Sequence, residues 1–220
     1  TMTRRSLMGG LAVSAFGGGV ARAVRVDTDG ALIIDGRRQF ILGLYDLPKI
    51  PDAAAQARDA GFNLLRVPAR REDLEAARRH ELYGWVGLGS ISPDRRAADQ
   101  RRIGDVVAAL KDHPALLFWE TEDEPAWQWK KPGPRVPAEQ ILATRRFVES
   151  LDPAHPFYLN HAPANLVETL RRYNAGADIV AVDIYPVVPR GIRELYALSP
   201  DGRHGAHELA EVTADALIVE

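Results

Sequence analysis

The segment from Ala115 to Trp127 carries the side chains best suited to chemistry in this sequence. Its four apolar residues at 115–118 predict a strand that is buried on both faces. Trp119 follows, and the next five positions hold three Glu and one Asp before Pro125 ends the run. Carboxylates perform acid–base chemistry, and indole rings stack on the faces of sugars. A buried strand that delivers both to its C-terminal end is typical of a site that cleaves glycosidic bonds.

The plainer interpretation of these acidic residues is a solvated loop or the cap of the next helix. Two features favour a site instead. Glu124 directly precedes Pro125, so we expect the backbone of Glu124 to be held in an extended conformation. Three of the four tryptophans of the chain, Trp119, Trp127 and Trp129, flank the acids. A solvated loop has no use for these indoles.

The N-terminal residues 1–23 have the composition of a targeting segment. A pair of arginines at 4–5 precedes an uncharged run at 9–20, and Ala21-Arg22-Ala23 fits a small-x-small cleavage site. This pattern resembles a twin-arginine export signal, with an ordinary secretory signal as the alternative. Either signal predicts a periplasmic or secreted protein. The uncharged run is too short to span a bilayer.

Composition limits the partners of the remaining domain, residues 24–220. The whole chain has a net charge of −2, and removal of residues 1–23 would take away three arginines and no acid. The resulting charge of −5 does not suit binding to nucleic acid or to an anionic membrane surface. The chain contains no cysteine, so it has no disulfide and no thiolate metal site.

Strands and helices alternate along the domain. Val24–Phe40 is expected to form a hairpin lead-in with turns at Asp29-Gly30 and Asp35-Gly36. The strands that follow are predicted at Phe40–Tyr45, Phe62–Val67, Glu81–Leu88, Ala115–Trp119, Phe157–Asn160 and Asp178–Asp183. The helices between them are predicted at Asp52–Ala60, Arg71–His80, Ala97–Lys111, Pro137–Leu151 and Pro163–Tyr173, with a last one from about Ala206. Such alternation predicts a parallel sheet with right-handed crossovers.

Two architectures fit this pattern, an eight-stranded barrel and an open doubly wound sheet. The turn after the first strand, at 45–48, lacks the glycines that a doubly wound sheet places there for phosphate. Polar residues follow the ends of several strands, as in barrels. The sequence therefore predicts an α/β TIM (β/α)8-type barrel with about six of its eight βα units present. We expect the chain to be truncated after Glu220.

Four short segments together resemble a large clan of retaining glycoside hydrolases with a barrel fold, which includes cellulases, β-mannanases and β-galactosidases. The segments are Leu42-Gly43-Leu44-Tyr45, His113 to Trp119, Asp123-Glu124-Pro125 and Asp183-Ile184-Tyr185-Pro186. The resemblance covers Phe40 to about Pro186. It implies hydrolysis of an O-glycosidic bond in a β-linked oligo- or polysaccharide, without a cofactor or a metal.

The resemblance also implies roles for single residues. Glu124 matches the acid/base, and nearby Glu122 and Asp123 are expected to raise its pKa by charge repulsion. Tyr185 matches a tyrosine that supports the nucleophile, and Arg66 matches a common arginine at the end of strand two. The remaining expected substrate contacts are Tyr45, Trp119, Asp123, Trp127, Asn160, His161 and Asp183.

The chain departs from the pattern of the clan at three places. Asp123 stands where the clan has an asparagine that contacts the sugar 2-hydroxyl, and Asp183 stands where it has a histidine. The nucleophilic glutamate of strand seven is expected beyond residue 220, because Glu220 itself follows a run with helical spacing. We therefore expect the 220-residue chain by itself to be inactive.

Two other functions also fit the sequence. A barrel that binds carbohydrate without cleaving it would explain the substitutions at Asp123 and Asp183. A metal-dependent barrel hydrolase would use Glu120, Glu122 and Asp123 as ligands, although no cluster of histidines accompanies these acids.

Overall fold

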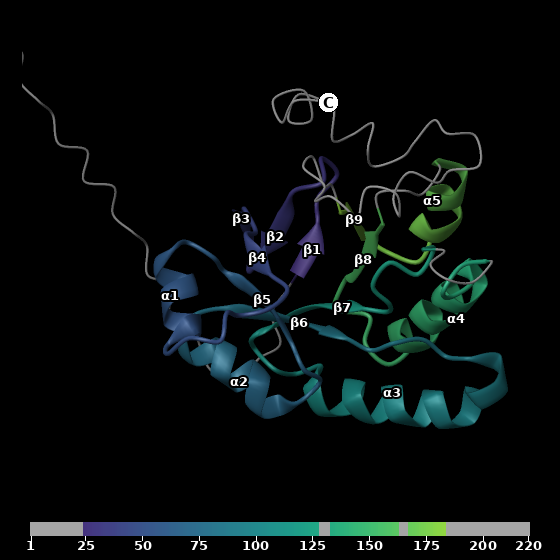
Figure 1. Ribbon diagram of the computed structural model, residues 1–220, viewed down its shortest axis with the longest axis horizontal. Helices are drawn as coiled ribbons and strands as arrows, with labels where there is room; N and C mark the ends of the chain where they lie inside the picture. The colour runs from purple at the N-terminus through teal and green to yellow at the C-terminus, as the bar shows by residue number, and fades with distance from the viewer. Residues whose placement is uncertain (1–23, 128–132, 163–166, 184–220) are drawn as a thin grey trace, which may run out of the picture.

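The computed structural model describes residues 24–127, 133–162 and 167–183, and two sheets make up its framework (Figure 1). Strands β1 (Val24–Val26), β2 (Leu32–Ile34) and β3 (Arg37–Gln39) form a small antiparallel sheet. The turn from β2 to β3 is Asp35-Gly36, and both residues have positive φ angles of 49° and 77°. Two positive φ angles in a two-residue turn match the twist of the strands that it joins.

The second sheet has six parallel strands in the order of the sequence, β4-β5-β6-β7-β8-β9. The strands are β4 (Gly43–Leu44), β5 (Leu64–Val67), β6 (Tyr83–Gly87), β7 (Leu116–Glu120), β8 (Phe157–His161) and β9 (Ile179–Val182). The helices between them are α1 (Ala53–Asp59), α2 (Arg71–Arg79), α3 (Arg96–Leu110), α4 (Ala138–Glu149) and α5 (Val167–Asn174), and a 3-10 turn (Pro93–Arg95) precedes α3.

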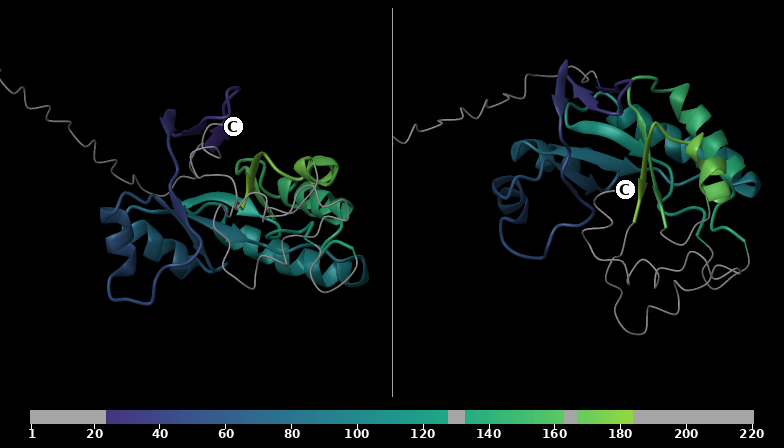
Figure 2. Two further views of the ribbon diagram at one scale, coloured as in Figure 1. Left: turned by 45° about the horizontal axis from the view of Figure 1, so that its top comes forward. Right: turned by 90° about the horizontal axis from the view of Figure 1, so that it is seen from above.

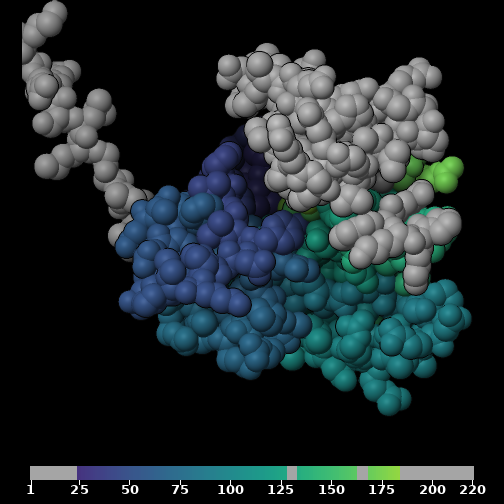
Figure 3. Space-filling view, in the orientation of Figure 1, coloured from purple at the N-terminus to yellow at the C-terminus, as the bar shows by residue number. Residues whose placement is uncertain are grey.

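The helices lie on one side of the parallel sheet and the small sheet lies on the other (Figures 1 and 2). Helix α3 turns Ile103, Val107 and Leu110 towards the strands, at the spacing of one helical face, and all three are buried. In the space-filling view, α1, α2 and α3 form a continuous lower surface (Figure 3). The other face of the sheet packs on β1 and β2 through Trp85 and Phe118.

The predicted TIM (β/α)8-type barrel with six βα units is wrong for the part of the chain that the structure describes. The parallel strands form a half-barrel sheet, with β4 and β9 as its two edges. Five helices follow the first five strands, and the residues after β9 lie outside the described ranges. The pattern of alternating elements fixes the strand order, but a barrel closes only when its two edge strands pair, and local sequence does not encode that pairing.

The predicted strands and helices between residues 40 and 183 are present as elements of the expected type, with ends that differ by a few residues. The first strand is the shortest and contains only Gly43–Leu44. Residues 1–23 and the helix predicted from about Ala206 lie outside the described residues. Within the described residues, no helix has the length and apolar character needed to cross a membrane.

Candidate active site

Glu124 is the buried carboxyl group at the centre of the candidate site. It lies in the loop after β7, and only 8% of its surface is exposed. Burial raises its pKa, and so do a hydrogen bond with Asp183 and the negative charges of Asp183 and Asp123. Arg135 opposes the rise. Glu124 therefore retains its proton at neutral pH.

A hydrogen-bonded network surrounds Glu124. Its backbone N–H donates to the carbonyl oxygen of Asn160 on β8 at 3.2 Å. The Asn160 side chain donates to Asp123 Oδ1 at 3.1 Å, and the Tyr45 hydroxyl donates to the same oxygen at 3.4 Å. The Tyr45 hydroxyl also lies 3.2 Å from that of Tyr158. These contacts join the residue after β4, strand β8 and the loop after β7 into one polar cluster at the C-terminal ends of the strands.

An ion pair between Arg66 and Glu120 extends this cluster across β6. Arg66 Nε donates to Glu120 Oε2 at 3.0 Å, and the guanidinium carbon lies 5.6 Å from the centre of the Tyr45 ring. Gly87 lies between them on β6, where a Cβ atom would be 3.1 Å from Arg66 Nη2 and 3.4 Å from Glu120 Oε2. Glycine at this position therefore lets the two side chains meet.

Glu120 is fully buried, and this burial raises its pKa to about 6. The positive charge of Arg66 acts in the opposite direction, and the negative charge of Asp123 adds to the rise. Glu120 Oε1 has no hydrogen-bond partner within the described part of the chain. The ion pair thus holds Arg66 in place at an energetic cost to the fold.

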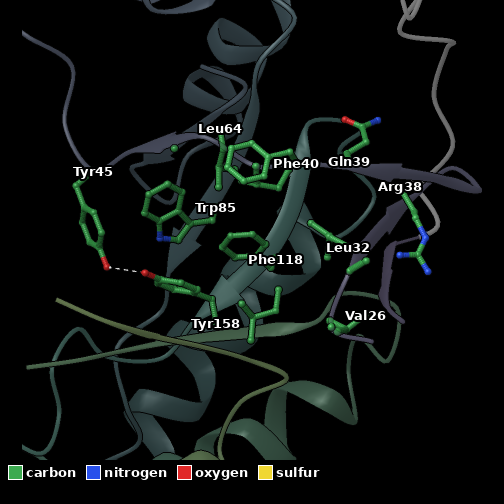
Figure 4. Close-up of a pocket in the computed structure, with 15 residues that line it drawn as sticks. Val26, Leu32, Arg38, Gln39, Phe40, Tyr45, Leu64, Trp85, Phe118 and Tyr158 are labelled. Atoms are coloured by element: carbon green, nitrogen blue, oxygen red, sulfur yellow. Dashed lines mark hydrogen bonds between the residues drawn. The ribbon is translucent and has the colours of Figure 1, made fainter. Parts of the chain in front are cut away.

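An aromatic cavity of about 640 Å³ lies between the parallel sheet and the small sheet (Figure 4). Its wall includes Tyr45, Trp85, Phe118 and Tyr158. Phe118 and Tyr158 stack with ring centres 5.3 Å apart, and Trp85 meets the edge of Tyr45 at 5.1 Å. The dashed line in Figure 4 marks the contact between the two tyrosine hydroxyls, which are the polar end of this aromatic wall.

The structure does not support Trp119 as a platform for a sugar. Side chains alternate along a strand, so Trp119 on β7 points to the helix side whereas Phe118 and Glu120 point to the site. Trp119 is fully buried, and its indole N–H donates to Asp152 Oδ2 at 2.8 Å. His155 Nδ1 contacts the same oxygen at 2.8 Å. Trp119 therefore belongs to the core and lies away from the polar cluster.

His161 also lies on the helix side, at the end of β8. It is buried, its Nε2 is 3.0 Å from Asn174 Oδ1 on α5, and its ring meets the edge of the Tyr173 ring. Burial lowers its pKa. The structure therefore places this neutral, buried histidine against a helix and does not bring it to the polar cluster.

The other expected site residues have different outcomes. The structure brings together Tyr45, Arg66, Asp123, Glu124, Asn160 and Asp183. Trp127 is half-buried two residues after Pro125, and its backbone N–H donates to Glu124 O at 3.1 Å. Tyr185 lies outside the described residues. Glu122 accepts a hydrogen bond from Ser90 at 3.0 Å and is not among the groups that raise the pKa of Glu124. That rise comes from burial, Asp183 and Asp123.

The backbone of Glu124 differs from the extended conformation expected before a proline. Its φ angle is 46°, in the left-handed region that residues with a side chain rarely adopt. A conformation of this kind costs roughly 1–3 kcal/mol and persists only where the surrounding contacts hold it, as they do at many functional sites. The contacts of its N–H with Asn160 and of its carbonyl with Trp127 hold it there.

The metal-dependent alternative finds no geometric support. Among the described residues, no group of three or more His, Cys, Asp or Glu side chains is arranged to hold a metal ion. The three acids proposed as ligands have separate partners, since Glu120 pairs with Arg66, Glu122 with Ser90, and Asp123 with Tyr45 and Asn160.

Sequence reasoning missed several residues that shape the site. Trp85, Gly87 and Tyr158 lie within predicted strands, and no local pattern indicates that Glu120 is the partner of Arg66. A signal was present, because Trp85 and Gly87, Phe118 and Glu120, and Tyr158 and Asn160 are each two residues apart. Residues with this spacing point to the same face of a sheet.

Comparisons with known proteins show which solved structures have a similar fold. No protein-family model matches the chain, and no curated protein sequence matches it. Solved structures do match. A glycosyl hydrolase family 2 member from Bacteroides cellulosilyticus DSM 14838 aligns with 16% identity and a TM-score of 0.54, over 74% of this chain and 24% of that one. Parabacteroides merdae β-glucuronidase aligns with 16% identity and a TM-score of 0.56, over 87% and 25%.

A family 2 β-galacturonidase from Eisenbergiella tayi aligns with 16% identity and a TM-score of 0.53, over 86% of this chain and 35% of that one. The chain therefore spans between about a quarter and a third of the length of these three structures. At this level of identity the similarity concerns the fold. It shows that the half-barrel sheet and its helices are built like a segment of glycosidases of family 2.

Proposed function

We propose that this chain is part of a glycoside hydrolase that cleaves an O-glycosidic bond of a β-linked glycan, with Glu124 as the acid/base. The observation that carries the proposal is the environment of Glu124. It is a buried carboxyl group with a raised pKa, held by Asp183 and by the contacts of its backbone at the C-terminal ends of parallel strands. The similarity in fold to family 2 glycosidases supports it.

The chemistry follows from the proton that Glu124 retains. A general acid must be protonated at the working pH in order to give its proton to the leaving oxygen. Burial and the neighbouring carboxylates supply this condition. After the bond breaks, the same group is a carboxylate and takes a proton from water. In a retaining mechanism, a second carboxyl group about 5 Å away would act as the nucleophile.

The test is the dependence of turnover on the leaving group. In Glu124→Gln of the full-length protein the shape remains but the proton is lost, so glycosides with poor leaving groups should lose roughly 10²- to 10⁴-fold in turnover. Aryl glycosides with good leaving groups should be spared in the step that breaks the glycosidic bond, because they need no protonation. Glu122→Gln is the matched control, since Glu122 contacts Ser90 outside the cluster.

A Glu124→Gln variant that is fully active on poor leaving groups would remove Glu124 from the mechanism.

A second candidate function, carbohydrate binding without cleavage, is favoured by the hydrogen bond that ties Glu124 to Asp183. It predicts that the full-length wild-type protein binds an oligosaccharide, shows no turnover on any leaving group, and keeps its affinity in Glu124→Gln.

We further propose that residues 1–23 direct export and are then removed, because they combine paired arginines, an uncharged run and a cleavage pattern. The N-terminus of protein recovered from the periplasm or medium should then lie near Val24. Recovery of an intact chain in the cytoplasm would contradict this proposal.

A further inference from the structure

The acid–base chemistry proposed above leaves the guanidinium group of Arg66 without a task. A guanidinium has five N–H donors, and only Nε of Arg66 makes a hydrogen bond among the described residues. The side chain of Arg66 is 39% exposed, whereas its partner Glu120 is fully buried. One edge of the group is therefore anchored, and the Nη atoms are left to donate to a ligand.

A hollow of about 280 Å³ lies beside these Nη atoms. It is formed at the C-terminal ends of β4, β5 and β6, and its wall includes Tyr45, Asp46, Arg66, Pro68 and Gly87. Tyr45 also lines the aromatic cavity, and its hydroxyl contacts Asp123, the neighbour of Glu124. A group bound in the hollow would thus lie next to the polar cluster that holds the proposed acid/base.

Two contacts and the absence of a side chain at Gly87 hold the guanidinium towards this hollow. Glu120 binds Nε at 3.0 Å, and the Tyr45 ring lies against the guanidinium with 5.6 Å between its centre and the guanidinium carbon. Gly87 provides the space in which Nη2 lies, because a Cβ atom there would be only 3.1 Å away. A flexible arginine held in this way loses little further freedom when it binds a ligand.

We propose that the hollow is a subsite for two adjacent hydroxyl groups of the glycan, that Arg66 determines specificity there, and that Glu120 and Gly87 are positioning residues. The inference rests on the proposed glycoside hydrolase function and deepens it. A planar guanidinium donates two parallel hydrogen bonds to two neighbouring oxygens, which a lysine does not reproduce. Neutral hydroxyls suit the hollow better than a carboxylate, because Glu120 balances the charge of Arg66 and Asp46 lines the same wall.

The experiment measures binding by calorimetry with the full-length protein. The neutral probes are cellotetraose, mannotetraose and xylotetraose, and the charged probe is a tetramer of β-1,4-linked glucuronic acid. We expect a neutral probe to bind most tightly. Arg66→Lys should weaken that binding roughly 10- to 100-fold, the effect of losing a charge-assisted hydrogen bond. Arg58→Lys is the control, because Arg58 pairs with Glu81 at the same side-chain exposure of 39%.

A second pair of variants tests the positioning role. Gly87→Ala should weaken binding roughly tenfold by pushing Nη2 aside, since a misplaced donor loses most of one hydrogen bond. Gly104→Ala is its control, because a Cβ atom there meets its neighbours at an ordinary 3.9 Å. Circular dichroism reports whether each variant folds.

The pH profile separates positioning from simple structural support. Four titratable or charged groups face Glu120. They are Arg66 on β5, Asp123 in the loop after β7, Tyr45 directly after β4, and Tyr158 on β8. Binding by the wild type should weaken as the pH falls below about 6, because Glu120 then takes up a proton and releases Arg66. Glu120→Gln should bind with an affinity that no longer changes over this pH range.

Each outcome bears on the inference. Wild-type affinity in folded Arg66→Lys and Gly87→Ala would overturn the subsite and leave the function of Glu124 in place. Tighter binding of the glucuronic acid tetramer would overturn the assignment of neutral hydroxyls. If the full-length wild type binds none of the probes and cleaves no glycoside, the proposed function fails, and the subsite fails with it.

Discussion

Replacement of Glu120 by glutamine should change the free energy of unfolding by an amount that depends on pH. The difference between the variant and wild type should favour the variant more at neutral pH than at acidic pH. Burial raises the pKa of the Glu120 carboxyl from 4.5 to about 6. An acid with a raised pKa in the folded state destabilises the fold once it ionises. The penalty is absent below pH 4.5, develops as the pH rises to 6, and is complete above that value. At 1.36 kcal/mol for each pKa unit, the penalty is about 2 kcal/mol.

The assay is urea unfolding followed by tryptophan fluorescence, at several pH values between 4 and 7.5. The quantity of interest is the unfolding free energy of Glu120→Gln minus that of wild type, because other titrating groups cancel in this difference. It should increase by about 2 kcal/mol from the acidic to the neutral end. Arg66 stays solvated in the variant, since its side chain is 39% exposed.

Glu149→Gln provides the matched control, at an exposed position at the end of α4. Its unfolding free energy should stay within about 0.5 kcal/mol of wild type, as for most surface substitutions. A difference between Glu120→Gln and wild type that stays constant across the pH range would refute the reasoning, because it would mean that the buried carboxyl titrates alike in the folded and unfolded chains.

Two further substitutions test the packing on which the site rests. Gly84→Ala on β6 places a Cβ atom 2.6 Å from Leu74 Cδ2 and 3.1 Å from Val67 Cγ2. This overpacking should lower the unfolding free energy, measured in urea, by about 1–3 kcal/mol. Unchanged stability would contradict the tight contact of α2 with the sheet. Trp119→Phe removes the hydrogen bond to the buried Asp152. The free energy of unfolding should fall by about 1–3 kcal/mol, while the affinity for an oligosaccharide stays unchanged. Weaker sugar binding at unchanged stability would return Trp119 to the site.

The sequence by itself determined the elements and the position of the polar residues along them. Apolar runs such as 115–118 become buried strands, and the helical spacing of Ile103, Val107 and Leu110 becomes the buried face of α3. Local periodicity encodes these outcomes, because burial selects the same face at each turn of a helix or strand. Since parallel strands end at one edge of the sheet, Tyr45, Arg66, Asp123 and Asn160 could be expected to meet there.

The tertiary structure decided how far the sheet closes and which face each side chain occupies. Trp119 and Glu120 are neighbours in sequence, yet the first enters the core beside Asp152 and the second meets Arg66 across Gly87. The half-barrel, with β4 and β9 as its edges, likewise depends on pairing between distant strands. The left-handed backbone of Glu124 reverses the local preference before proline, because the contact of its N–H with Asn160 on β8 outweighs that preference. Interactions between residues far apart in sequence set all three outcomes, and a local pattern contains no record of them.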